Sequence, residues 1–304
     1  MIKILATDGM EKSAVKALTD KGCQVDATFY EPDALCEAVR DYDVLVVRSA
    51  TKVRKAQIDA AAEAGRLKLI IRGGVGVDNI DVDYAESKGI LVRNTPRASS
   101  DAVAELALAH ILSVARFISI AGHTIRMGKW EKKAYKGIEL TGRTVGIIGY
   151  GRIGQALGRR CQALGMKVVA YDIYHAEGVE NENMRYVEMD ELLNVSDIIS
   201  IHTPSLPGQP LVNAETIAKM KDGVILINTS RGTNIDEDAL LAALESGKVY
   251  GAGLDVFATE PAKNEALYSH PHVSCTPHVG ASTAEAQKRI GAEIVDLITK
   301  QFSL

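Results

Sequence analysis

The sequence predicts an α/β fold with parallel sheets, and three observations carry this prediction. The 304 residues are enough for two domains of ordinary size. Short β-branched runs alternate with amphipathic helical runs along the chain, which is typical of parallel sheets with helices on both faces. A complete strand–helix–strand unit with a glycine-rich turn occupies residues 140–172, in the middle of the chain.

The first 97 residues contain strands and helices in alternation. We expect strands at residues 2–7, 24–28, 44–47, 68–71 and 90–92, and helices at 10–20, 32–39, 55–64 and 82–88. The segment Gly73-Gly74-Val75-Gly76 follows the fourth strand and lacks the third glycine of a dinucleotide-binding turn. Ligands of α/β proteins bind at the carboxyl ends of parallel strands, so this loop is still a candidate binding loop.

A long helical run is expected from Ser99 to Met127. Its apolar face is too broad for an ordinary surface helix, which places it in the centre of the molecule between domains or subunits. Thr95-Pro96 marks the boundary before it. The segment from Gly128 to Lys136 is polar and basic around the only tryptophan, and a surface linker is the plain interpretation.

The strand–helix–strand unit has the residues that a dinucleotide needs. An apolar strand at 144–148 is followed at once by Gly149, Gly151 and Gly154, and a helical run follows. In such a turn the first glycine allows the tight bend, the second admits a pyrophosphate, and the third lets helix and strand pack closely. The helix N-terminus then offers free N–H groups to the phosphates.

Asp172 closes the second strand of this unit, about 20 residues after the turn. An acid at this position accepts hydrogen bonds from the adenosine ribose hydroxyls. A carboxylate repels a 2′-phosphate, and no arginine follows it directly. The sequence therefore predicts NAD as the cofactor rather than NADP.

Polar residues follow four strands of the second half of the chain. We expect strands at residues 197–201, 223–228, 249–256 and 273–276, and helices at 188–194, 214–220, 236–245 and 284–300. Thr203, Arg231, Glu260 and His278 stand after those strands in turn. Parallel strands end at one edge of a sheet, so these side chains are expected to gather there.

These residue types suit the movement of a hydride and a proton between an alcohol and a carbonyl. A histidine can act as general acid and base near neutral pH, and His278 is the candidate for this role. Glu260 can orient its imidazole, and Arg231 can hold a carboxylate with two hydrogen bonds. Taken singly, each has a plainer interpretation, such as a solvated cation for the arginine or a turn residue for the glutamate before Pro261.

Four segments resemble the D-isomer-specific 2-hydroxyacid dehydrogenase family, and the similarity covers nearly all of the chain. The segments are VGIIGYGRIGQALG (145–158), VILINTSRGTNIDEDAL (224–240), GLDVFATEP (253–261) and TPHVGAST (276–283). The resemblance implies that Arg231, Glu260 and His278 are the catalytic set. It further implies an NAD site made of Val75, Gly149, Gly151, Arg152, Ile153, Gly154, Asp172, Thr203, Pro204, Thr229, Ser230, Arg231, Asp255, His278, Gly280 and Ala281.

A second set of segments is similar to the members that oxidise D-3-phosphoglycerate, the first step of serine synthesis. These segments are VVRSATKV (46–53), RGGVGVDNID (72–81), NTPRASS (94–100) and GKWEKK (128–133). A substrate with a phosphate and a carboxylate carries about three negative charges. The implied substrate-binding residues are Arg48, Arg72, Gly73, Gly74, Ser99, Arg231 and His278, with Lys132 contributed by a partner subunit.

The resemblance also implies the domain organisation. The chain is expected to form two Rossmann-like domains. A nucleotide domain of residues 97–280 is inserted into a substrate domain of residues 1–96 and 281–304. Relatives of this kind pair through the nucleotide domains, so a homodimer is expected. The sequence ends at residue 304, so we expect a short form without a serine-binding regulatory domain.

Three departures from the family pattern concern the substrate more than the reaction. Thr233-Asn234 replaces a small or apolar pair after the arginine–glycine. The loop Leu206–Pro210 is altered, and Ser99 stands where an asparagine often helps to position substrate.

Composition limits the partners and the compartment. The net charge is −4, which argues against a nucleic-acid scaffold. Four scattered cysteines suggest neither a disulfide framework nor a zinc site, and no metal is expected. No apolar stretch is long enough to span a membrane, and no signal-peptide pattern is present, so a cytoplasmic protein is expected.

Two other functions stay open. A glyoxylate or hydroxypyruvate reductase would use the same three residues with a different pocket. A corepressor-like protein that senses NAD without turnover would share the fold, although the chain lacks long disordered flanks.

Overall fold

The computed structural model describes residues 1–205 and 208–304 and divides the chain into two compact units. Unit 1 consists of Met1–Ser99 and Ala281–Leu304, and unit 2 consists of Ser100–Gly280. The first boundary therefore falls after residue 99, where the sequence analysis placed it after residue 96. Each unit has its own sheet and core, and each is described by itself.

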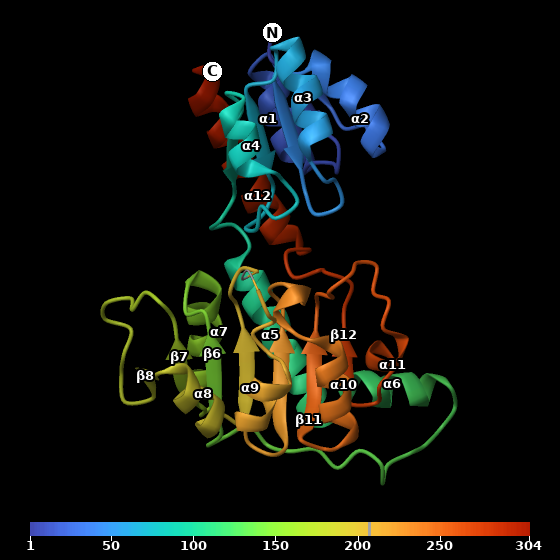
Figure 1. Ribbon diagram of the computed structural model, residues 1–304, viewed down its shortest axis with the longest axis vertical. Coiled ribbons are helices and arrows are strands. Elements are labelled where there is room, and N and C mark those ends of the chain that lie inside the picture. Colours follow the sequence, from blue (N-terminus) through green and yellow to red (C-terminus); the bar gives the residue numbers. More distant parts are fainter. Residues whose placement is uncertain (206–207) are drawn as a thin grey trace. The chain divides into compact units, whose positions relative to one another are not determined.

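Unit 1 contains a five-stranded parallel sheet in the order β2-β1-β3-β4-β5 (Figure 1). The strands are β1 (Lys3–Ala6), β2 (Gln24–Asp26), β3 (Val44–Val47), β4 (Leu69–Arg72) and β5 (Leu91–Asn94). All four residues of β3 are buried because both faces of this central strand are covered.

Helices cover both faces of this sheet. The helices of unit 1 are α1 (Lys12–Asp20), α2 (Pro32–Ala38), α3 (Lys55–Ala64), α4 (Val82–Ser87) and α12 (Ala284–Phe302), with a short 3-10 turn η1 (Val39–Asp41). Side chains of α2, α3 and α4 form one core and those of α1 and α12 the other. At Gly291 an added Cβ would lie 2.8 Å from Ala14 Cβ, so α12 packs directly on α1. The C-terminal helix, red in Figure 1, thus completes the N-terminal unit.

Unit 2 contains a seven-stranded parallel sheet in the order β12-β11-β10-β9-β6-β7-β8. The strands are β6 (Thr144–Ile148), β7 (Lys167–Tyr171), β8 (Met184–Tyr186), β9 (Ile198–Ile201), β10 (Val224–Asn228), β11 (Val249–Leu254) and β12 (Val273–Cys275). The edge strand β8 was not expected from the sequence, since three residues give too short a pattern to detect.

The two faces of this sheet have separate cores. The helices of unit 2 are α5 (Ser100–Arg116), α6 (Ile118–Arg126), α7 (Arg152–Ala163), α8 (Met189–Val195), α9 (Ala214–Lys219), α10 (Glu237–Glu245) and α11 (Glu265–Tyr268), with a 3-10 turn η2 (Gly232–Asn234). Side chains of α5 and α7 fill one core, and those of α8, α9, α10 and α11 fill the other. Figure 1 shows α8, α9 and α10 across the near face of the sheet.

The single helix expected from Ser99 to Met127 is wrong, because the chain breaks at Phe117. Phe117 adopts a left-handed backbone with φ 57°, and α5 and α6 meet there at a bend of 67°. Its buried ring packs edge-on against His272 and Tyr250, with centroid distances of 5.3 and 5.9 Å. This aromatic packing offsets the cost of the left-handed conformation. In the described parts of the chain no single helix is long and apolar enough to cross a membrane, although α5 and α6 together pass that test of length and composition.

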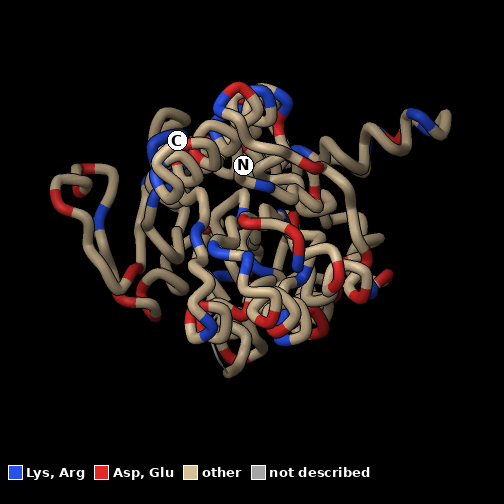
Figure 2. The backbone as a smooth tube through the Cα atoms, turned by 90° about the horizontal axis from the view of Figure 1, so that it is seen from above, with Lys and Arg blue, Asp and Glu red and all other residues tan. Residues whose placement is uncertain are grey.

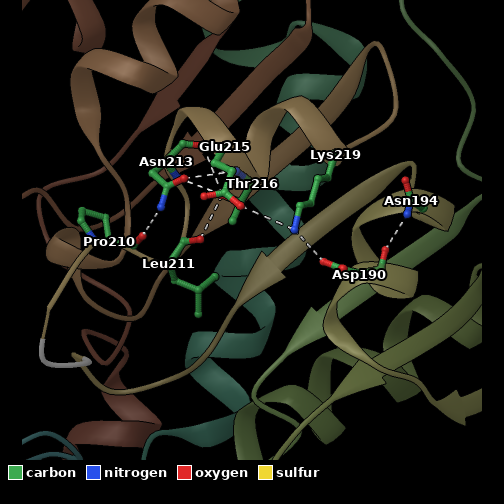
Figure 3. Close-up of polar contacts among 8 residues, drawn as sticks. All are labelled: Asp190, Asn194, Pro210, Leu211, Asn213, Glu215, Thr216 and Lys219. Carbon is green, nitrogen blue, oxygen red and sulfur yellow. Dashed lines mark hydrogen bonds and ion pairs between the residues drawn. The ribbon is translucent and has the colours of Figure 1, made fainter.

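Helix α9 begins with a capping box, in which Asn213 and Thr216 exchange hydrogen bonds (Figure 3). The Asn213 side chain accepts a hydrogen bond from Thr216 N at 3.1 Å, and the Thr216 hydroxyl accepts one from Asn213 N at 2.9 Å. At the other end of α9, Lys219 forms an ion pair with Asp190 of α8 at 3.1 Å. Asn213 Nδ2 also donates to Pro210 O at 3.0 Å, which fixes the end of the altered loop Leu206–Pro210. Residues 206–207 of this loop lie outside the described residues.

Charged residues are mixed along both units. In Figure 2, lysine and arginine alternate with aspartate and glutamate along the chain, and neither sign forms a long run.

Candidate active site

The carboxyl ends of the parallel strands in unit 2 carry most of the candidate residues. Those that lie at this edge are Gly149, Gly151, Arg152, Ile153, Gly154, Asp172, Thr203, Pro204, Thr229, Ser230, Arg231, Asp255, Glu260, His278 and Gly280. The predicted redox residues and the predicted dinucleotide turn therefore lie on one edge of one sheet.

The glycine turn after β6 leaves open space at one position only. A Cβ at Gly149 (φ 89°) would lie 2.9 Å from the backbone carbonyl of His202, and one at Gly154 would lie 2.3 Å from Gly149 O. A Cβ at Gly151 would meet nothing within 4 Å. Gly149 and Gly154 are thus required by the packing of the chain, whereas Gly151 keeps room for a group from outside. This is what a pyrophosphate at the N-terminus of α7 needs.

Asp172 stands beside this turn at the end of β7. Its Oδ2 accepts a hydrogen bond from Tyr150 N at 2.6 Å, and its Oδ1 accepts one from Tyr174 N at 3.0 Å. Each carboxylate oxygen can accept a further hydrogen bond. The carboxylate is therefore held in place with acceptor capacity left for ribose hydroxyls, and the residues present fit NAD.

His278 and Glu260 form a hydrogen-bonded pair. His278 Nδ1 lies 2.8 Å from Glu260 Oε2, and the side chains are 32% and 39% exposed. The backbone of His278 is left-handed, with φ 53°, and its N–H donates to Asp255 O at 2.8 Å. The imidazole is thus aimed by one carboxylate and remains accessible to a small molecule.

Glu260 is the anionic partner of this pair. Burial alone would raise its pKa, but the hydrogen bond and the charge of His278, with smaller contributions from Phe257 N–H and Arg231, hold the pKa below its usual value. An ionised Glu260 accepts from an N–H at Nδ1 of His278, so the lone pair of the neutral imidazole lies on Nε2.

Arg231 lies in the loop after β10. Asn228 fixes this loop, since its Nδ2 donates to Arg231 O at 2.8 Å and its Oδ1 accepts from Ser230 N at 3.0 Å. A Cβ at the next residue, Gly232, would lie 1.9 Å from the backbone carbonyl carbon of Phe257. The loop of Arg231 therefore packs directly on the loop that carries Glu260, which brings the two charges near each other.

Asn234 also belongs to this site, although it was not predicted as a site residue and was noted only as a departure from the family pattern. It is buried, and its Nδ2 donates to Thr203 O and to Ser230 Oγ, both at 3.1 Å. It thus joins the loops after β9 and β10, which both carry predicted NAD-binding residues. The Thr229 hydroxyl between them is buried without a hydrogen-bond partner among the described residues, so it is available to a ligand.

His202 stands at the end of β9 with its ring enclosed. Nε2 lies 2.9 Å from Ser200 Oγ, and Nδ1 has no hydrogen-bond partner among the described residues. Burial lowers the pKa of His202 from 6.5 to about 4.

This histidine should make the folded state sensitive to acid. Between these two pKa values the unfolded chain binds a proton that the folded chain does not, so stability falls as the pH falls through this window. We expect the free energy of unfolding to decrease by about 2–3 kcal/mol from this site between about pH 7 and about pH 4.5. Urea unfolding of the wild type and of His202→Gln at both pH values measures the difference. Equal acid sensitivity of the two proteins would contradict the assignment.

The remaining candidates lie in unit 1 or on exposed surface. Val75, Gly73, Gly74, Arg48, Arg72, Ser99 and Ala281 belong to unit 1, whereas Lys132 is exposed in the segment that follows α6 of unit 2.

The carboxyl edge of the unit 1 sheet has its own fixed loops. Asp8 accepts hydrogen bonds from Arg48 N at 2.6 Å and from the Thr51 hydroxyl at 2.6 Å, and Asn79 Nδ2 donates to Arg48 O at 2.7 Å. The Arg72 guanidinium lies on Gly74, where an added Cβ would be 1.3 Å from Nη1. These loops present two arginines at one edge. The anchors Asp8 and Asn79 were not predicted from the sequence.

No group of three or more His, Cys, Asp or Glu side chains is arranged to hold a metal ion in the described parts of the chain.

Comparisons with known proteins agree with this arrangement. Residues 108–280 match the family described as D-isomer specific 2-hydroxyacid dehydrogenase, NAD binding domain. The chain is 48% identical to a hydroxypyruvate reductase of Thermotoga maritima, over 99% of each protein. It is 45% identical to a D-3-phosphoglycerate dehydrogenase of Methanocaldococcus jannaschii, over 99% of this chain and 57% of that protein.

A solved structure gives the same picture of the fold. A D-lactate dehydrogenase from Aquifex aeolicus, in complex with NAD and lactic acid, superposes with a TM-score of 0.85 at 32% identity, over 98% of this chain and 94% of that one.

Proposed function

Because the chain belongs to the D-isomer specific 2-hydroxyacid dehydrogenase family, we propose that Arg231, Glu260 and His278 carry out its NAD-dependent reaction on a D-2-hydroxy acid. The observation that carries this proposal is the 2.8 Å pair of His278 and Glu260. This pair lies on the sheet edge that also carries the dinucleotide turn and Arg231.

The residues around the turn hold the cofactor in this proposal. The N-terminus of α7, with Gly151, would hold the pyrophosphate, and Asp172 would accept hydrogen bonds from the adenosine ribose. Thr203 and Ser230, joined by Asn234, would hold the rest of the cofactor. A bound NAD would supply the hydride chemistry at C2 of the substrate.

His278 moves the proton of the reaction. With Nδ1–H donated to Glu260, the lone pair of Nε2 accepts the proton of the 2-hydroxyl during oxidation and returns it during reduction. Glu260 stabilises the imidazolium that this transfer creates. The loss of one hydride and one proton turns the alcohol into a carbonyl, so charge and atoms balance.

Arg231 binds the substrate carboxylate. Its guanidinium keeps its charge at any working pH and can form two parallel hydrogen bonds with a carboxylate. Such a contact fixes C2 and its hydroxyl relative to His278, which is the positioning that the transfer requires.

For the substrate we propose D-3-phosphoglycerate, which would make the reaction the first step of serine synthesis. Several relatives support this choice, although the chain spans only 57% of the length of the Methanocaldococcus jannaschii one. Arg48 and Arg72 at the edge of unit 1 are the proposed phosphate ligands. Hydroxypyruvate is the second candidate, because the Thermotoga maritima reductase matches over 99% of both proteins. The oxidised form of D-3-phosphoglycerate, 3-phosphohydroxypyruvate, differs from hydroxypyruvate only in the phosphate.

Activity on the two carbonyl substrates tests this choice. We expect a higher kcat/KM for 3-phosphohydroxypyruvate than for hydroxypyruvate. Arg48→Ala and Arg72→Ala should each lower kcat/KM for the phosphorylated substrate by about 10-fold or more, since a hydrogen bond to a charged group contributes about 1.5–3 kcal/mol. Both variants should leave hydroxypyruvate reduction unchanged. Arg40→Ala, which removes a surface ion pair of unit 1, is the matched control. Equal losses on both substrates would rule out phosphate recognition by these arginines.

We further propose that the protein is a homodimer. Four apolar side chains of α6 and the following segment are exposed: Ile118 58%, Ile125 59%, Met127 58% and Trp130 82%. A group of exposed apolar side chains is typical of a protein–protein contact. Sedimentation velocity should give a dimer for the wild type and a monomer for Ile125→Glu. Phe29→Glu changes an equally exposed apolar residue of unit 1 and should remain dimeric. A monomeric wild type would refute the proposal.

A further inference from the structure

A buried histidine contacts the segment that leads from β12 to His278. His110 of α5 is 2% exposed and has partners on both ring nitrogens. Nδ1 lies 3.0 Å from Ser274 Oγ, and Nε2 lies 3.0 Å from Thr276 Oγ1. These two hydroxyls belong to β12 and the residue that follows it, two positions before His278. The proposed reaction does not use His110.

The donor and the acceptor of each hydrogen bond around His110 can be assigned. The Thr276 hydroxyl donates its single proton to Asp255 Oδ1 at 2.6 Å, so it can only accept from the histidine. Nε2 of His110 therefore carries a proton, and Nδ1 accepts from the hydroxyl of Ser274. Burial lowers the pKa of His110 although the charge of Asp255 opposes the shift, so the ring is neutral at pH 7.

The chain of hydrogen bonds ends on the loop of His278. The buried Asp255 carboxylate also accepts from Val279 N and Gly280 N, both at 2.8 Å. Asp255 O accepts from His278 N at 2.8 Å. Three successive amides are thus bound by one residue. A left-handed backbone at His278 costs free energy for a non-glycine residue and persists only where the surroundings fix it.

Packing holds His110 in position. A Cβ at Gly253 of β11 would lie 2.5 Å from His110 Cβ, so helix and strand touch at this point. One turn further along α5, Val114 packs in the same way on Gly251, where an added Cβ would be 2.6 Å from Val114 Cγ1. Of these two residues, His110 is connected by hydrogen bonds to the loop of His278, whereas the apolar Val114 contributes packing alone.

We propose that His110 is a positioning residue for His278. It orients the Thr276 hydroxyl toward Asp255, and Asp255 then holds residues 278–280 in the conformation that presents the imidazole. This inference rests on the proposed role of His278. It gives a positioning role to a residue of α5, a helix that packs on one face of the sheet.

Three variants test this role. His110→Leu removes the donor to Thr276, His110→Gln keeps a side-chain N–H that can replace Nε2–H, and Val114→Ala removes packing alone. We expect His110→Leu to lower kcat by about 10-fold, because a small misplacement of a reacting group has effects of this size or larger. The Kd for NADH, measured by fluorescence, should change by less than about twofold. His110→Gln should recover most of kcat, and Val114→Ala should keep kcat despite a lower Tm.

Hydrogen exchange gives a readout that does not depend on turnover. The amides of Val279 and Gly280 should exchange about 10-fold faster in His110→Leu, and at the wild-type rate in the other two variants. Unchanged exchange in His110→Leu would overturn the proposal, as would equal losses of kcat in the leucine and glutamine variants. If exchange responds as expected while the wild-type protein turns over no 2-hydroxy acid, the positioning inference stands and the proposed function fails.

Discussion

Replacing His278 by asparagine is expected to lower kcat by about 10³-fold, within the range of about 10²–10⁴ that a general acid–base residue contributes. Asparagine tolerates the left-handed backbone seen at this position and can donate a hydrogen bond to Glu260. It cannot carry a proton between the substrate hydroxyl and solvent. Steady-state kinetics in both directions gives kcat, and an NADH titration separates this loss from any loss of cofactor binding.

Two further variants sharpen this test. Glu260→Gln should cost about 10²-fold in kcat, because the imidazole remains but loses the carboxylate that stabilises its charged form. His175→Asn, at an exposed histidine stacked on Tyr186, should have full activity. A kcat near the wild-type value in His278→Asn would show that another group moves the proton. A wild-type protein that binds NADH and turns over no 2-oxo acid would favour a non-catalytic, NAD-sensing role.

Much of the fold could be predicted because it depends on local patterns. Buried parallel strands give apolar, mostly β-branched runs: β3 is apolar over its whole length, and β6 and β9 are so at most of their positions. The break at Phe117 depends on something else. The helical pattern continues through it, and the reason for the bend is a contact with Tyr250 and His272, which are distant in the sequence.

The candidate site was predictable to the extent that strand ends reveal it. Arg231, Glu260 and His278 follow successive strands of one sheet, and the parallel arrangement brings them to one edge. Asn234 and His110 could not be found in this way. Both are polar side chains within the packed interior, and their roles depend on hydrogen-bond partners that only the tertiary structure brings near. A polar residue where a buried apolar one is expected is the available signal, as at Asn234.

Replacing Arg231 by lysine should lower kcat/KM for 2-oxo acids by about 10²-fold. Lysine keeps the positive charge but cannot form the planar pair of hydrogen bonds that a guanidinium makes with a carboxylate. Loss of a charge-assisted contact of this kind costs about 1.5–3 kcal/mol, and misorientation of C2 relative to His278 adds to it. The measurement is kcat/KM with saturating NADH.

The substrate itself provides the control for this prediction. If Arg231 acts through the carboxylate, the wild type and Arg231→Lys should differ strongly on a 2-oxo acid and little on the corresponding amide, which has no carboxylate. Arg160→Lys keeps the charge beside Asp101 and Glu105 and should match the wild type on both substrates. An equal loss of kcat/KM on the acid and the amide would mean that Arg231 stabilises its loop and does not bind the substrate carboxylate. In that case the contact of Gly232 with the loop of Glu260 would explain the effect of the substitution.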